Sequence, residues 1–273
     1  MAEPKDNDEN NWGFGTGDPV SRLAGTLYGT QVKKVSEKVA TYDIGAKRLR
    51  STFNAARSEA DRSAAILIFA LADDLMLSGL EQHLRGHVKG GWAEVSSGNG
   101  LLATATDRIT LLALLAWIEP VVYSDLRALK SIRNLFAHHP DAIGFDDEKA
   151  KSYIATLSPF EKEMSRQMAL GGDAPISQRQ IYLIRSGFTL THLVHNLAVG
   201  PLAREEHVAP GHVERVNWEE LPSNIRELYN ILGEHIVSVM KPASSRPSAP
   251  TPILPKENDP NVSPGLPAEE YGV

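Results

Sequence analysis

Apolar residues recur along most of this chain at intervals of three and four positions, which is the period of an amphipathic helix. The segment 123–139 shows this pattern most clearly, with apolar residues on one face and polar residues on the other. Ser124 is a suitable N-cap, and Pro140 prevents the helix from continuing. The pattern therefore predicts a helix that begins near Ser124 and ends before Pro140.

The same periodicity predicts further helices on both sides of this segment, and no segment shows the alternation typical of a strand. The expected helices cover 28–57, 58–85, 104–119, 146–157, 160–169, 177–199 and 222–240. Capping residues are expected at Ser58, Asp146 and Ser177. The prediction is an all-α fold, a bundle of about six or seven helices, with a loop at 86–101 and a turn at 140–145.

Both ends of the chain have the composition of disordered segments. Residues 1–19 are acidic and polar, and residues 241–273 contain eight of the 17 prolines. We therefore expect one all-helical domain over 20–240, with a disordered tail on each side.

The charge distribution argues against a dedicated DNA-binding domain, which is usually distinctly basic. The net charge is −6, of which 1–19 contributes −4 and 241–273 contributes −1, so the middle is almost neutral. The most basic stretch is 28–57, which we interpret as a solvated helix face, with a ledge for RNA or an acidic partner as the alternative. There is no cysteine and no basic-then-apolar leader, so we expect a soluble cytoplasmic protein that does not bind membranes.

Two helices contain charges where apolar residues are expected. The helix at 58–85 is apolar on every side between Ala64 and Ala72, which predicts the buried centre of the bundle, yet Asp73 and Asp74 follow directly. A buried carboxylate needs a cation or several hydrogen-bond donors. In the helix at 123–139, Arg133 falls in the apolar row with Leu129 and Phe136. We expect Arg133 to pair with Asp73 or Asp74, and Arg108 is the second candidate.

Arg133, Asn134 and His138 form the one cluster in the sequence where chemistry is expected, and Arg127 shares the neighbouring helix face. One interpretation is structural, with Arg133 in an ion pair and His138 at a helix C-terminus that favours positive charge. The other is ribonuclease chemistry, in which an imidazole moves a proton and a guanidinium stabilises transition-state charge.

No metal or cofactor site is predicted. His192 and His195 are three apart on one helix, but a histidine pair at helical spacing is more often structural, and no HExxH or cysteine pair accompanies it. Phosphate loops, nucleophile elbows and helix-turn-helix spacings are absent from the sequence as well.

Four motifs in order resemble the mannitol operon repressor (MltR-like) family. They are DRSAAILIFALADDLM, TATDRITLLALLAWIE, YSDLRALKSIRNLFAHH and GFDD. The resemblance covers 61–147 and continues weakly to 199. It implies an all-helical transcriptional regulator that has no DNA-reading motif of its own and acts through a protein partner.

A broader resemblance is to HEPN domains, whose ribonuclease members carry Arg, four to six residues, then His. Arg133 and His138, with four intervening residues, match this spacing, and Asn134 matches a preferred polar position. The resemblance implies a composite site across a homodimer. On the sequence alone we favour the regulatory function, with a metal-independent, toxin-like endoribonuclease as the alternative.

Overall fold

The computed structural model describes residues 37–85, 91–139, 143–159, 176–205 and 221–240. These residues form helices and no strand, which confirms the expected all-α class for this part of the chain. The predicted tails and the helix expected at 160–169 lie outside the described residues.

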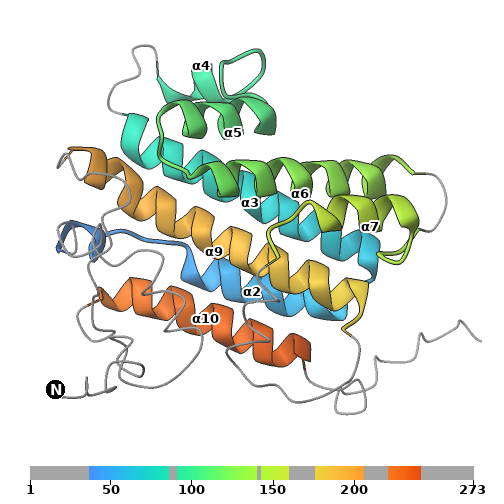
Figure 1. Cartoon of the computed structure of the whole chain (residues 1–273). Helices are drawn as coiled ribbons and strands as arrows, with labels where there is room; N and C mark the ends of the chain where they lie inside the picture. The colour runs from blue at the N-terminus through green and yellow to red at the C-terminus, as the bar shows by residue number, and fades with distance from the viewer. Residues whose placement is uncertain (1–36, 86–90, 140–142, 160–175, 206–220, 241–273) are drawn as a thin grey trace, which may run out of the picture. The chain divides into compact units, whose positions relative to one another are not determined.

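The helices follow one another along the chain as Figure 1 shows. They are α2 (Ala46–Ser58), α3 (Asp61–Leu84), α4 (Trp92–Ser96), α5 (Ala105–Leu114), α6 (Pro120–His138), α7 (Glu148–Ala155), α9 (Gln178–Glu205) and α10 (Ser223–Met240).

The helical stretch predicted over 28–57 is wrong only in being continuous, because the chain turns at 41–45 before α2 begins. Gly45 has a φ of 67°, in the left-handed region that favours glycine. Its amide donates to Oδ1 of Asp43 at 2.8 Å. A side chain at Gly45 would be strained and would also meet Arg48 and Leu75 at 3.2–3.3 Å.

The cap predicted at Ser58 is also wrong, since its hydroxyl donates to the carbonyl of Ala55 inside α2. The N-cap of α3 is Ala60, whose methyl side chain cannot accept a hydrogen bond. Asp61 instead accepts a hydrogen bond from the amide of Phe145 at 2.8 Å and forms an ion pair with Arg179. Its carboxylate therefore joins three segments of the chain.

The cap predicted at Ser177 is confirmed as a reciprocal capping box. The amide of Gln180 donates to Oγ of Ser177 at 3.2 Å, and the amide of Ser177 donates to Oε1 of Gln180 at 3.0 Å. The Gln180 amide nitrogen also donates to the carbonyl of Val239 at 2.9 Å, which attaches the start of α9 to the end of α10.

Two further helix starts differ from the sequence prediction. α6 begins at Pro120 with Glu119 as its N-cap, so Ser124 lies inside the helix. α7 is capped by Asp147, whose carboxylate accepts from two backbone amides, and not by its neighbour Asp146.

The segment before α6 is also more broken than predicted. The expected loop at 86–101 contains the short helix α4, and α5 ends at Leu114 rather than near residue 119. Ala116, with a φ of 51°, turns the chain between α5 and α6.

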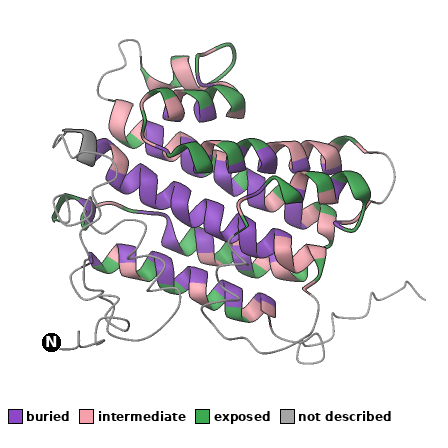
Figure 2. Ribbon diagram, viewed as in Figure 1, coloured by how far each residue is buried: buried purple, intermediate pink, exposed green. Residues whose placement is uncertain are grey.

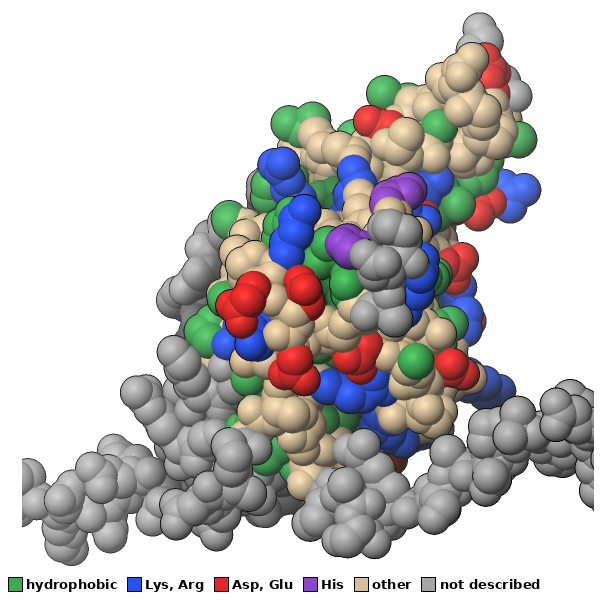
Figure 3. Space-filling model, turned by 90° about the vertical axis from the view of Figure 1, so that its right-hand side faces the viewer, with side chains coloured by type: hydrophobic (Ala, Val, Ile, Leu, Met, Phe, Trp, Pro, Cys, Tyr) green, Lys and Arg blue, Asp and Glu red, His purple; other side chains and the backbone are tan. Residues whose placement is uncertain are grey.

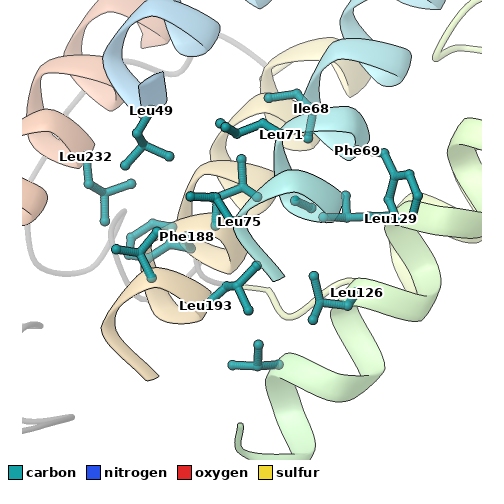
Figure 4. Close-up of a cluster of buried hydrophobic side chains, with 14 of the residues drawn as sticks. Leu49, Ile68, Phe69, Leu71, Leu75, Leu126, Leu129, Phe188, Leu193 and Leu232 are labelled. Atoms are coloured by element: carbon teal, nitrogen blue, oxygen red, sulfur yellow. The ribbon is translucent and has the colours of Figure 1, made fainter. Parts of the chain in front are cut away.

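The most completely buried helix is α9, whose residues 182–199 are all buried (Figure 2). It contacts α2, α3, α6, α7 and α10. Leu49 of α2, Phe188 of α9 and Leu232 of α10 belong to the shared core (Figure 4). The prediction that α3 is buried on every side is wrong, because Ile66 and Ala70 are exposed.

Small residues allow the helices to approach α9 closely. A Cβ on Gly79 of α3 would lie 2.9 Å from the side chain of Leu197, and a Cβ on Gly187 of α9 would lie 2.9 Å from the ring of His235. These two contacts set the spacing of α9 from α3 and from α10.

α3 has the length and composition of a helix that could cross a membrane, with half of its most apolar window buried in the fold. The core helix of a bundle has the same properties, because it is apolar around most of its circumference.

We expect the buried imidazole of His235 to make folding pH-dependent. It stacks on Phe53 with ring centroids 4.1 Å apart, and its Nε2 donates to the carbonyl of Leu183 at 3.0 Å. Burial lowers the pKa of His235 from 6.5 to about 4; the Leu183 carbonyl opposes this shift, and the charge of Arg57 adds to it. Because the unfolded chain binds the proton first, the free energy of unfolding falls as the pH drops from about 6.5 to 4, by about 3 kcal/mol for this group.

Urea unfolding at pH 7 and at pH 4.5 measures this loss. The variant His235→Gln should show a smaller difference between the two pH values than the wild type. An equal difference in both proteins would show that His235 does not carry the effect.

Candidate functional site

Arg133 does not take part in the ion pairs of α3. Arg108 of α5 is buried, donates to Asp73, and also donates to the carbonyls of Leu102 and Ala103 at 2.9 and 3.2 Å. Arg108, the second candidate, is therefore the partner of Asp73. The predicted ion pair between Arg133 and Asp73 is wrong.

Asp74 is also paired elsewhere, with Arg48 of α2 on the surface. Arg133 donates from Nη1 to Oδ1 of its neighbour Asn134 at 3.0 Å. Both side chains are half-buried, and within the described ranges no ion pair joins Arg133 to a carboxylate. The structural explanation of Arg133 as the counter-charge of α3 therefore does not hold.

The rest of the basic stretch at 28–57 is partly in ion pairs. Arg50 of α2 pairs with Glu227 and Glu234 of α10. Residues 28–36 lie outside the described residues.

The polar face of α6 borders a pocket of about 210 Å³ between α5 and α6. Its described lining contains hydroxyl groups, an amide and two cations but no carboxylate. The lining residues are Thr106, Ile109, Thr110, Tyr123, Arg127, Lys130, Ser131 and Asn134. Positions 127, 131, 134 and 138 form one row along α6, because residues three and four apart are neighbours on a helix.

Contacts inside the pocket hold its two cations. Nζ of Lys130 donates to Oγ1 of Thr106 across the two helices. Nη1 of Arg127 donates to the hydroxyl of Tyr123 at 3.1 Å, and its guanidinium carbon lies 5.6 Å from the centre of that ring. The pocket is therefore positive and rich in hydrogen-bond donors.

His138 is exposed at the last turn of α6, one turn beyond Asn134. Arg62 of α3 donates to the carbonyl of Ala137 at 3.3 Å, which brings a further cation to this helix end. Figure 3 shows this end of the molecule, where histidine side chains lie beside Lys and Arg side chains. His139, the next residue, is half-buried.

The other candidate histidines belong to the core. Burial lowers the pKa of both His192 and His195 to about 3, which keeps both rings neutral, and His195 faces the hydroxyl of Tyr229 at 3.2 Å. Among the described residues there is no group of three or more potential metal ligands.

A second buried polar network, around Asp125, was not predicted from the sequence. Asp125 accepts from the amide and hydroxyl of Ser158 at 3.0 Å and from Thr189 at 3.3 Å. Arg185 of α9 donates to the carbonyls of Ile154 and Leu157 at the end of α7. This network attaches α7 to α6 and α9. Its polar groups therefore serve to hold the helices together.

The sequence predicted the polar row of α6 but not the residues of α5 that form the other wall of the pocket. Thr106 and Thr110 come from α5, and only the packing of α5 on α6 brings them opposite Lys130 and Asn134. The spacing of the two threonines, one turn apart, was the available indication.

Comparison with known proteins finds no matching family model, curated protein or solved structure. The MltR-like and HEPN-like resemblances therefore stay predictions from the motifs.

Proposed function

We propose that this chain cleaves RNA without a metal ion, using Arg133, Asn134 and His138 at the end of α6. The observation that carries the proposal is the environment of Arg133. Its predicted carboxylate partners are paired with Arg108 and Arg48, and it contacts Asn134 on the border of a positive pocket. A half-buried arginine that the described fold does not neutralise is suited to an anionic ligand from outside the chain.

The chemistry follows from the groups present. An imidazole such as that of His138 takes the proton of a ribose 2′-hydroxyl, and the oxygen attacks the adjacent phosphorus. The bond from phosphorus to the 5′-oxygen breaks, and the products are a 2′,3′-cyclic phosphate and a 5′-hydroxyl that takes up a proton. Arg133 stabilises the extra negative charge in the transition state, and Asn134 orients its guanidinium.

Because the reaction needs both a base and an acid, the single imidazole of the Arg133–Asn134–His138 motif supports a site formed by two copies. His138 of a second copy would then protonate the 5′-oxygen. This arrangement is the homodimer implied by the HEPN resemblance, and we propose it as part of the same function.

The test is incubation of the full-length protein with a labelled RNA in excess EDTA. We expect cleavage to fragments that end in a 2′,3′-cyclic phosphate. Absence of cleavage, or equal cleavage by His138→Ala, would overturn the proposal.

A second candidate is the MltR-like regulatory function, exerted through a protein partner. It is supported by two large apolar side chains on the α4–α5 segment, since Leu101 is 71% exposed and Leu114 is 78% exposed. Exposed apolar residues of this size favour contact with another protein when they belong to one surface.

For this candidate, affinity purification of the tagged chain from its native host should recover a partner that Leu114→Glu fails to recover. Val237→Glu on α10 is a matched control, because that residue is 49% exposed on a different helix. Recovery of the same partner by Leu114→Glu would contradict a role for Leu114 in binding that partner.

A further inference from the structure

We propose that the pocket between α5 and α6 binds a phosphate group of the RNA strand a few nucleotides away from the bond that is cut. This inference rests on the proposed function for its choice of RNA as the ligand. The pocket is distinct from the Arg133–Asn134–His138 motif but shares Asn134 with it.

The charge of the pocket differs from that of the chain. The protein carries a net charge of −6, whereas the described lining contains Arg127 and Lys130 without a carboxylate. Arginine and lysine supply most of the affinity of proteins for nucleic-acid phosphates. The pocket therefore favours an anionic ligand, although the molecule as a whole carries a net negative charge.

The neutral groups of the lining also fit a phosphodiester. Hydroxyls from Thr106, Thr110 and Ser131 can donate to phosphate oxygens, and they can accept from a ribose 2′-hydroxyl. The volume of about 210 Å³ exceeds that of a few water molecules, each of which takes about 30 Å³ in the liquid. A phosphate with part of its ribose can enter.

The position of the pocket connects it with the motif. At a rise of about 1.5 Å per residue, Arg127 and His138 lie about 16 Å apart along α6. Asn134 lies between them, lining the pocket and accepting from Arg133. A strand that follows the polar row of α6 would place one phosphate between Arg127 and Lys130 and a later phosphodiester at His138.

The experiment measures RNA binding separately from cleavage. The full-length chain with His138→Ala is titrated into a fluorescein-labelled single-stranded RNA, and the dissociation constant is read from fluorescence anisotropy at several salt concentrations. The double variant Arg127→Gln/Lys130→Gln is made in the same background. The double variant Arg85→Gln/Lys149→Gln, which removes two exposed cations outside the pocket, is the matched control.

We expect the double variant to weaken RNA binding at least tenfold at low salt. Each lost phosphate contact should also reduce the slope of log K against log salt by about 0.7. Arg85→Gln/Lys149→Gln should leave both quantities unchanged. Inorganic phosphate, tested as a competitor, should displace the RNA only at far higher concentration than unlabelled RNA.

The possible outcomes separate the two proposals. RNA binding that depends on Arg127 and Lys130, in a protein whose wild type does not cut RNA, supports the pocket and overturns the nuclease. Unchanged binding in the double variant overturns the pocket, whether or not the wild type cuts. Equal competition by inorganic phosphate and RNA overturns the choice of RNA as the ligand.

Discussion

Replacing His138 with alanine should lower the rate of RNA cleavage by about 10²–10⁴-fold, the usual contribution of a positioned acid or base. The free energy of unfolding should stay within about 0.5 kcal/mol of the wild type, because the side chain is exposed at the last turn of α6. Cleavage of a labelled RNA in EDTA gives the rate, and urea unfolding gives the free energy.

The matched control for His138 is its neighbour. His139 is half-buried and follows the helix, so its side chain leaves the row formed by Arg127, Ser131, Asn134 and His138. His139→Ala should keep most of the activity. If His139→Ala abolished cleavage and His138→Ala did not, the assignment of the motif would be wrong.

Replacing Arg108 with alanine should lower the free energy of unfolding by about 2–3 kcal/mol. Loss of one partner from a buried ion pair costs about 3–5 kcal/mol. The smaller value applies because the side chain of Asp73 is 34% exposed, so water solvates the carboxylate that remains. The carbonyls of Leu102 and Ala103 also lose their donor.

Arg133→Ala is the matched control for this stability effect. Arg133 also belongs to a helix that packs in the core, but its contact with Asn134 is local and half-exposed. We expect a loss of no more than about 1 kcal/mol. Equal destabilisation by the two variants would show that Arg133 has a structural partner after all.

The sequence predicted the helices with strong apolar periodicity and the position of the polar row on α6. It did not rank Arg108 above Arg133 as the partner of Asp73. That choice depends on how α5 packs against α3, which brings the two residues together across 35 positions in the chain.

The burial of residues 182–199 of α9 was not foreseen for a related reason. Its sequence contains Arg185, His192 and His195, which suggest a polar face. Arg185 is satisfied by carbonyls at the end of α7, and the histidines become neutral on burial, so these polar residues lie in the core. Such partners come from other helices and are not visible in the local pattern.

Local backbone chemistry explains the remaining differences. The turn before α2 depends on the left-handed conformation of Gly45. The period of apolar residues does not predict this conformation. The cap at Ser177 was predictable because both halves of its capping box lie three residues apart.

We propose that Arg133 is not required by the fold and serves a ligand from outside the chain. The most direct measurement is the rate of RNA cleavage by Arg133→Ala in EDTA, made on protein whose free energy of unfolding is measured alongside. We predict at least a 100-fold lower rate with almost unchanged stability. Cleavage at the wild-type rate, or a loss of stability as large as that of Arg108→Ala, would contradict this role of Arg133.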